Sequence, residues 1–397
     1  MKIGIIRENK IPEDKRVPLT PSQCKEVLQK FSGVQIKVES SDIRCYNDSD
    51  YKKEGIEVVE NVSDCDVLLG VKEVPAELLI ENKTYFFFSH TIKEQEYNRD
   101  LLREILKKKI RMIDYEVLTD VDKRRIIAFG RYAGIVGAYN GIWTFVKRYR
   151  LFDLRRAHNC FDLEDLKSEF EKVKLPISKI VVTGGGRVAK GAIEVLLGMN
   201  IRQVSPAQLL SHDYDEAVFA QLNSRDYHVH KSGEEFKRTE FYKHPDRFDS
   251  TFLNFAKQSN ILIAGAYWDP RSPVLFNRHD MISPDFKIRV IADITCDIEG
   301  SIPSTKRPTT IDDPIYDYNP SDDREEQALS DEGNVTVMAV DNLPCELPRD
   351  ASRDFGEELI KNVLPQGGRG FRRRAVWQQP QTLLPLRRGL VSSIRNL

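Results

Sequence analysis

The strongest constraint on the fold is a short segment in which a buried-strand pattern leads directly into a glycine-rich turn and a helix. Residues 180–183 (IVVT) are all β-branched, which is typical of a buried parallel strand. Residues 184–189 follow the pattern GxGxxA, in which the first glycine permits a tight turn and the second lets a pyrophosphate approach backbone N–H groups at the positive end of the helix. The segment predicts a dinucleotide-binding α/β unit whose cofactor contacts are Gly184, Gly186, Arg187, Val188 and Ala189. A glycine-rich turn without a ligand is the alternative.

The same pattern predicts where the ribose of the cofactor binds. In such a unit an acidic residue about 20 residues beyond the turn bonds the 2′-hydroxyl of NAD. Here the next predicted strand, residues 201–204, is followed by Ser205. An acid would repel a 2′-phosphate, so its absence favours NADP and leaves NAD open, with Ser205, Arg202 and Arg187 as candidate phosphate partners. These residues are equally compatible with an ordinary protein surface.

The N-terminal half alternates between predicted strands and predicted helices. Strand patterns cover residues 2–6, 34–38, 66–71 and 84–88, and a segment that starts at Ile110. A helix capped by Thr20 is expected to begin at Pro21, and another covers residues 93–109. This alternation predicts a parallel sheet with helices on both faces. Further along, residues 133–149 predict a long apolar helix, and residues 313–333, rich in Asp, Pro and Glu, predict a loop or crossover.

Four polar residues lie at the ends of predicted elements in this half: Arg16, Lys72, His90 and Glu116. The carboxyl ends of parallel strands face the crevice in which α/β proteins bind ligands. Burial lowers the pKa of a lysine and a histidine titrates near neutrality, so Lys72 and His90 together suit proton transfer. Each residue by itself also fits a solvated or structural role.

Composition and charge exclude several classes of protein. No stretch approaches the roughly 18 uninterrupted apolar residues of a membrane span, and the N-terminal residues MKIGIIREN do not resemble a signal peptide. The six cysteines are scattered without a CxxC pair, which favours a reducing, cytoplasmic compartment. His228 and His230 have no carboxylate cluster beside them, so no metal site is expected. Seven arginines in residues 367–397 leave the preceding 366 residues with a net charge of −8, which argues against nucleic-acid binding.

Several longer motifs resemble a known superfamily. Residues 69–75 (LGVKEVP) resemble the LxVKExP motif of alanine dehydrogenases, transhydrogenase α-subunits and saccharopine dehydrogenases, and residues 15–21 (KRVPLTP) resemble the substrate-arginine motif of the same superfamily. Further segments resemble lysine-forming saccharopine dehydrogenases, above all the lysine–ketoglutarate reductase half of the bifunctional lysine-degrading enzyme. They are residues 83–95, 113–116, 128–134, 243–247, 293–297, 341–344 and 347–348. The resemblance covers roughly residues 1–365.

The resemblance implies an α/β fold of two Rossmann-like domains with parallel sheets and an active site in the cleft between them. The first domain is discontinuous: residues 1–145 plus about 335–366 form the substrate and catalytic domain. Residues 146–334 form the inserted NAD(P)-binding domain. Residues 367–397 do not resemble the segment with which relatives end, and form an atypical basic tail. An altered reading frame or unrelated end explains the tail, with a basic partner-binding segment as the alternative.

The resemblance also implies an activity. It is a reversible, NAD(P)H-dependent reductive condensation of L-lysine with 2-oxoglutarate to saccharopine, catalysed by an oxidoreductase acting on CH–NH bonds. The implied roles are acid–base catalysis for Lys72 and His90, carboxylate binding for Arg16 and Arg125, substrate binding for Glu73 and Glu116, with Glu116 facing the lysine amine, and cofactor binding for Asp293 and Asp297. Glu73 agrees with the NAD-linked fungal enzymes, so NAD and NADP both stay open.

The expected partners are small molecules (lysine, 2-oxoglutarate and saccharopine), with no nucleic acid, no membrane and a possible homo-oligomer. One alternative is another amino-acid dehydrogenase of the alanine dehydrogenase type, although a site with Glu116 and Arg125 is wide and charged for a substrate as small as alanine. A non-catalytic, nucleotide-binding relative is the other.

Overall fold

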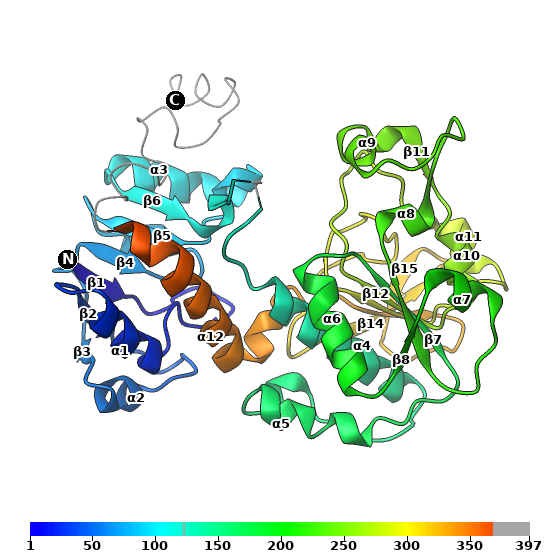
Figure 1. The fold of residues 1–397 in the computed structure, drawn as a ribbon, viewed down its shortest axis with the longest axis horizontal. Helices are drawn as coiled ribbons and strands as arrows, with labels where there is room; N and C mark the ends of the chain where they lie inside the picture. Colours follow the sequence, from blue (N-terminus) through cyan, green and yellow to red (C-terminus); the bar gives the residue numbers. More distant parts are fainter. Residues whose placement is uncertain (122–123, 368–397) are drawn as a thin grey trace. The chain divides into compact units, whose positions relative to one another are not determined.

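The computed structural model describes residues 1–121 and 124–367, and the chain divides into two compact units (Figure 1). Unit 1 is Met1–Phe129 together with the chain from Pro348 onward, and unit 2 is Gly130–Leu347. The predicted fold class, α/β with a discontinuous first domain, is confirmed. The predicted tail, residues 367–397, lies outside the described residues from 368 onward.

Unit 1 has a six-stranded, fully parallel sheet in the order β3-β2-β1-β4-β5-β6. Its strands are β1 (Lys2–Ile5), β2 (Gln35–Glu39), β3 (Glu57–Val59), β4 (Val67–Leu69), β5 (Thr84–Phe87) and β6 (Arg111–Asp114). Its helices are α1 (Pro21–Lys30), α2 (Asp48–Lys53), α3 (Arg99–Lys107) and α12 (Pro348–Glu358), the last continuing into a π-helical turn, Leu359–Val363. Thr20 caps α1 as predicted, because its hydroxyl accepts a hydrogen bond from the Gln23 N–H.

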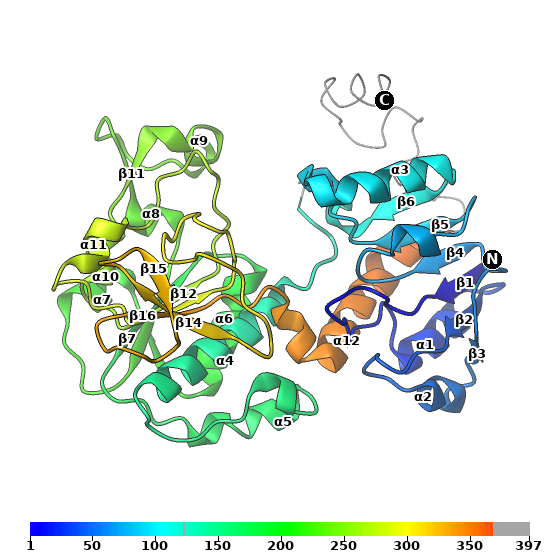
Figure 2. The same ribbon diagram turned by 180° about the vertical axis from the view of Figure 1, so that it is seen from behind.

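The two faces of this sheet bury separate clusters, and β5 shows how the sequence specifies them. Phe86 packs with α1 and α12 on one face, whereas Tyr85 and Phe87 pack with α3 on the other. This is the alternation expected of a strand whose successive side chains point to opposite faces. Helix α12 therefore belongs to unit 1 although it lies more than 200 residues further along the chain from the sheet (Figure 2).

Unit 2 has an eight-stranded sheet in the order β15-β14-β16-β13-β12-β7-β9-β8. Its strands are β7 (Lys179–Thr183), β8 (Arg202–Val204), β9 (Val218–Leu222), β12 (Ile261–Ala264), β13 (Val290–Asp293), β14 (Ile315–Asn319), β15 (Arg324–Glu326) and β16 (Val335–Met338). The strands from β16 to β8 run parallel, and β14 and β15 add antiparallel strands at one edge. A separate antiparallel pair joins β10 (His228–His230) and β11 (Phe248–Ser250).

The helices of unit 2 are α4 (Gly130–Arg148), α5 (Leu163–Lys167), α6 (Arg187–Gly198), α7 (Pro206–Ser211), α8 (Ser224–Tyr227), α9 (Arg238–Lys243), α10 (Leu253–Ala256) and α11 (Arg278–Ile282). Within the described ranges, no helix is both long and apolar enough to cross a membrane.

Two expectations need correction. The domain boundaries expected at 145/146 and 334/335 fall at 129/130 and 347/348, because α4 packs closely against α6 and β16 completes the sheet of unit 2. A Cβ on Gly134 would lie 1.9 Å from the Val188 carbonyl oxygen, so only glycine permits this approach of the two helices. The predicted loop at residues 313–333 contains β14 and β15; the acidic Asp317 is buried, where it accepts a hydrogen bond from Thr336 at 2.7 Å.

Candidate active site

A group of polar side chains follows the neighbouring strands β1, β4, β5 and β6 of unit 1. Parallel strands end at the same edge of a sheet, so the segments that follow them lie side by side. The sequence singled out three residues at this edge, namely Lys72 after β4, His90 after β5 and Glu116 after β6. The structure places all three at this edge, and the carboxyl groups of Glu8, Glu73 and Asp114 bond the segments that carry them.

His90 is held by a carboxylate. Its Nδ1 lies 2.5 Å from Oε1 of Glu73, and the other oxygen of Glu73 accepts a hydrogen bond from the Lys10 ammonium at 2.6 Å. Burial alone would raise the pKa of Glu73, but the bonds from His90 and Lys10 outweigh it and lower the pKa to about 2. Glu73 is thus an ionised partner that fixes the imidazole and leaves Nε2 as the nitrogen that can exchange a proton with a ligand.

Lys72 lies on a turn that a second buried carboxyl holds in place. Glu8 accepts hydrogen bonds from the backbone N–H groups of Val71 at 2.6 Å and Lys72 at 3.0 Å. Burial, together with the nearby Asp14, raises the pKa of Glu8 to about 8. Burial also lowers the pKa of Lys72, and the positive charge of Arg16 adds to this effect. A half-buried lysine with a lowered pKa can act as a base near neutrality.

Arg16, the predicted carboxylate-binding residue, is buried, with 3 % of its surface exposed. Its Nε and Nη2 donate to the two oxygens of Asp14 at 2.9 and 2.5 Å, and its guanidinium lies 4.1 Å from the ring centroid of Phe129. Arg16 therefore already holds a carboxylate of the chain itself.

Glu116 and Arg125 form an ion pair, with Nη2 of Arg125 3.0 Å from Oε1 of Glu116. The second oxygen, Oε2, is buried and has no hydrogen-bond partner among the described residues. The segment is anchored by Asp114, which accepts bonds from the Ser89 hydroxyl at 2.5 Å and from the Glu116 N–H at 2.8 Å. Asp114 thereby ties the loop that carries His90 to the loop that carries Glu116.

Three members of this group were missed by the sequence prediction: Glu8, Asp14 and Lys10. Glu8 had a usable signal, because it follows the predicted strand at residues 2–6 in the way that Lys72 and His90 follow theirs. Asp14 and Lys10 had none, because they lie in an irregular segment whose partners are set by the tertiary fold.

The glycine turn of unit 2 has the expected geometry. Gly184 has φ +106°, a conformation that favours glycine, and its N–H donates to the Leu222 carbonyl at 2.8 Å. A Cβ built on Gly186 would meet nothing within 4 Å, so open space lies beside the first turn of α6. The turn thus fits a pyrophosphate. Arg187 is exposed, whereas Ala189 is fully buried and contributes packing, and Val188 packs beside Gly265 and Gly130.

The remaining predicted cofactor residues are placed differently. Ser205 caps α7, accepting a hydrogen bond from the Gln208 N–H at 3.2 Å, and it follows β8 at the edge of the sheet. Strand β8, which follows α6 along the chain, is separated from β7 by β9. Asp293 is buried and accepts bonds from the hydroxyls of Thr295 and Thr305, each at 2.6 Å, so its carboxylate stabilises the loop after β13. Asp297 is exposed in that loop.

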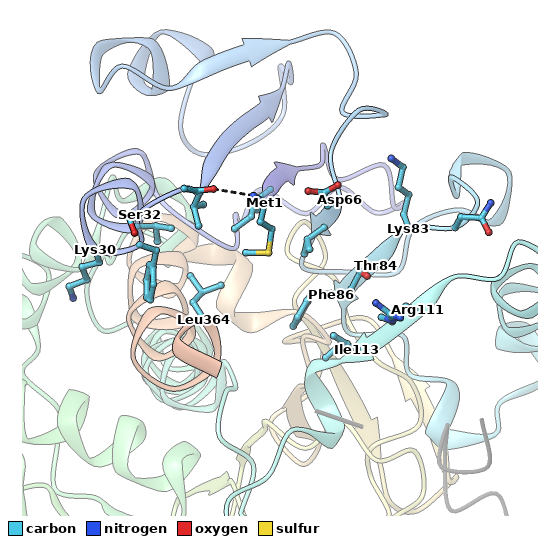
Figure 3. A pocket seen from close by; sticks show the side chains of 17 residues that line it. Met1, Lys30, Ser32, Asp66, Lys83, Thr84, Phe86, Arg111, Ile113 and Leu364 are labelled. Carbon is cyan, nitrogen blue, oxygen red and sulfur yellow. Dashed lines mark hydrogen bonds between the residues drawn. The ribbon is translucent and has the colours of Figure 1, made fainter. Parts of the chain in front are cut away.

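A cavity of about 1220 Å³ lies elsewhere in unit 1 (Figure 3). Asp66, Lys83 and Arg111 line it, and these residues precede or begin β4, β5 and β6. The cavity is therefore at the amino edge of the sheet, opposite the edge that carries Lys72 and His90. Ligands of parallel α/β sheets bind at the carboxyl edge, so this cavity is not the candidate site.

One unit with an acid–base group and another with a dinucleotide-type glycine turn define a two-domain, Rossmann-type α/β protein. Family models agree: "Alanine dehydrogenase/PNT, N-terminal domain" matches residues 4–136, and "Alanine dehydrogenase/PNT, C-terminal domain" matches residues 170–383. The chain belongs to the alanine dehydrogenase/PNT family, as the resemblance predicted.

Individual relatives share about a third of their residues with this chain or fewer. The mitochondrial α-aminoadipic semialdehyde synthase of Mus musculus is 33 % identical over 91 % of this chain and 43 % of its own length. The saccharopine dehydrogenase [NAD(+), L-lysine-forming] of Emericella nidulans is 26 % identical over 96 % of both chains. The chain spans less than half the length of the first curated relatives that it matches.

Solved structures share the fold. An L-alanine dehydrogenase superimposes with a TM-score of 0.63 at 18 % identity, covering 95 % of this chain and 92 % of that one. A transhydrogenase from Sinorhizobium meliloti superimposes with a TM-score of 0.57 at 15 % identity, covering 92 % and 94 %.

Proposed function

We propose that the chain catalyses the reversible, NAD(P)H-dependent reductive condensation of L-lysine with 2-oxoglutarate to saccharopine. The ε-amine of lysine attacks the keto carbon, water leaves, and the resulting imine is reduced. The observation that carries the proposal is that Lys72, whose pKa is lowered, and His90, whose ring is held by Glu73, follow two neighbouring strands at the same edge of one sheet. The names of the relatives, saccharopine dehydrogenase and α-aminoadipic semialdehyde synthase, support the choice of substrates.

Two proton transfers are needed, and Lys72 and His90 divide them. One group takes a proton from the incoming amine, and one gives a proton to the departing oxygen. A neutral Lys72 is suited to the first role, because burial and the charge of Arg16 favour its uncharged form. The Nε2 of His90 is suited to the second role, because Glu73 holds the ring through Nδ1 and leaves Nε2 for a ligand.

The other predicted residues are assigned to substrate recognition. Oε2 of Glu116 is a buried acceptor without a partner among the described residues, so it suits the ammonium or amine of lysine. Arg125, which is partly exposed, and Arg16 are assigned to the carboxylates of the two substrates, because a guanidinium suits a carboxylate. Glu73 acts through His90 and is a positioning residue.

The glycine turn of unit 2 would hold the pyrophosphate through Gly184, Gly186 and the first N–H groups of α6, near Arg187. When bound, the nicotinamide supplies the hydride that reduces the imine. We assign Asp297 to the neighbourhood of the nicotinamide, and Asp293 to the support of that loop.

The test is oxidation of NADPH and NADH by the purified chain with 2-oxoglutarate and a panel of amines, beside pyruvate with ammonia. We expect turnover with 2-oxoglutarate and lysine and little with shorter amines. Turnover with pyruvate and ammonia alone would instead indicate an alanine dehydrogenase. Nicotinamide fluorescence that reports binding without any turnover would indicate a non-catalytic relative.

The compartment and the assembly stay predictions. We place the chain in the cytoplasm and allow a homo-oligomer, on the composition of the sequence. The names of the mammalian relatives place those proteins in mitochondria. Fractionation of the source cells and sedimentation of the purified chain decide the two points.

A further inference from the structure

The strand beside the glycine turn is not the one that follows it in the sequence. Strand β8 comes next along the chain but pairs with β9 at the edge of the sheet, and β9 lies between β8 and β7. The Gly184 N–H donates to the Leu222 carbonyl at 2.8 Å, and the Gln221 side-chain amide donates to the Gly184 carbonyl at 2.9 Å. The residue that leaves the strand next to the turn is therefore Asn223.

The register of the strands removes Arg202 from the turn. Arg202 is level with Val218 of β9, which is level with Lys179 at the amino end of β7. Four residues of strand separate Lys179 from Thr183, which places Arg202 about 13 Å from the carboxyl edge at a rise of about 3.3 Å per residue. Its Nε also pairs with Oε1 of Glu216 at 2.6 Å.

Asn223 and Arg225, unlike Arg202, follow the strand that lies next to the glycine turn. The Asn223 Oδ1 lies 2.7 Å from where a Cβ on Gly185 would be, so its side chain borders the turn itself. Arg225 is exposed, and no carboxylate of the described residues lies within ion-pair distance of it. The nearby Asp226 accepts the Asn223 N–H at 2.6 Å. The Asn223 amide carries no charge that would repel an anion, and the Arg225 guanidinium, two residues further on, can bind one.

We propose that Asn223 and Arg225 form the subsite for the adenosine ribose of the cofactor, and that this subsite takes a 2′-phosphate. A 2′-phosphate has acceptor oxygens that a guanidinium can bond in pairs, whereas the 2′-hydroxyl of NAD is normally held by an acid at the position that Asn223 occupies. The inference rests on the proposed function only in that the cofactor is a nicotinamide dinucleotide. It favours NADP(H) as the cofactor of this chain because of Asn223 and Arg225, and not because of Ser205 and Arg202.

The experiment is a binding titration of the full chain, without amine or keto acid. NADPH and NADH are titrated by nicotinamide fluorescence, and adenosine 2′,5′-bisphosphate and 5′-AMP by calorimetry. The variants are Arg225→Gln and Asn223→Asp, with Arg202→Gln as the matched arginine control.

We expect NADPH to bind more tightly than NADH. Arg225→Gln should weaken NADPH and the 2′,5′-bisphosphate about 10- to 100-fold, the range for a hydrogen bond between charged groups, and leave NADH and 5′-AMP unchanged. Asn223→Asp should weaken NADPH selectively, and Arg202→Gln should change neither cofactor.

Any other binding result overturns the inference. Tighter NADH binding in the native chain points to Asp226 as the ribose acceptor, and a selective loss of NADPH in Arg202→Gln restores the assignment that the sequence order predicts. Absence of binding by either cofactor overturns the inference together with the proposed function. Selective loss of NADPH in Arg225→Gln, without turnover of lysine and 2-oxoglutarate in the native chain, would leave the subsite standing and refute the proposed activity alone.

Discussion

At the scale of single residues, the carboxylates decide what the basic groups can do. Glu73, expected among the substrate-binding residues, bonds His90 and Lys10. Glu8 holds the turn of Lys72, and Asp14 occupies two donors of Arg16. The basic residues predicted from strand ends thus depend on acidic neighbours for orientation.

Lys72→Met and His90→Gln should each lower turnover about 100- to 10,000-fold, the usual contribution of general acid–base catalysis. Cofactor affinity should stay unchanged, because the glycine turn lies in unit 2. Steady-state rates over a range of pH, beside fluorescence titration with NADPH, measure both effects. Each variant should also lose one limb of the pH–rate profile.

Lys30→Met, which changes an exposed lysine on α1, is the control and should keep full activity. Unchanged turnover in either variant would make that residue structural.

Glu73→Gln should remove a pH-dependent part of the stability. The pKa of Glu73 is about 2 in the folded chain against 4.5 without the fold, so its ionisation stabilises the native state above pH 4.5. This stabilisation is lost as the pH falls from 4.5 towards 2. We expect the variant to be less stable than the native chain by up to about 3 kcal/mol at neutral pH, a difference that shrinks below pH 4.5. Urea unfolding at pH 7, 5, 4 and 3 measures it, and a difference that is constant over this range would contradict the assignment.

At the scale of elements, α4 is held by contact with α6. The residues of α4 predict a long buried helix, but only the contact with α6 explains why it belongs to unit 2. Gly134 and Gly191 lie where each helix meets the backbone of the other, since a Cβ on Gly191 would be 2.1 Å from the Arg131 carbonyl oxygen. The domain boundary expected from the resemblance came after this helix, because an apolar helix by itself does not indicate which sheet it covers.

Gly134→Ala should destabilise unit 2, because the added methyl meets backbone atoms that cannot move aside independently. Overpacking of this kind typically costs about 1–3 kcal/mol, and the free energy of unfolding from urea titration should fall by that amount. Gly186→Ala is the matched control in the same unit, where the new methyl has open space. Equal stability of the two variants would show that α4 and α6 separate easily.

At the scale of the whole molecule, unit 2 is one uninterrupted stretch of chain inserted into unit 1. It contains a complete sheet, its own hydrophobic cluster and the glycine turn. Unit 1, by contrast, needs α12 from beyond the insertion, because Phe355 and Leu359 complete the cluster on one face of its sheet.

A fragment covering residues 130–347 should therefore fold and bind the cofactor without catalysing the reaction, because Lys72 and His90 lie outside it. Circular dichroism and thermal unfolding test the fold, and nicotinamide fluorescence tests binding. Gly186→Val in the same fragment is the control: its side chain has room in the protein, so loss of binding would report a ligand that uses this space. A fragment that stays unfolded would show that unit 2 depends on unit 1.

The sequence by itself determined what depends on local pattern. The β-branched run before Gly184, the strand predicted at residues 84–88 and the capping of α1 by Thr20 all depend on near neighbours, and the structure confirms each. Only the tertiary structure decided which strands are neighbours and which charges meet. Ser205 follows the glycine turn in sequence but Asn223 borders it in space, and Glu73 bonds His90, which lies 17 residues further along the chain. Strand order and ion pairing join residues far apart in the chain, and short-range pattern carries no information about such pairings.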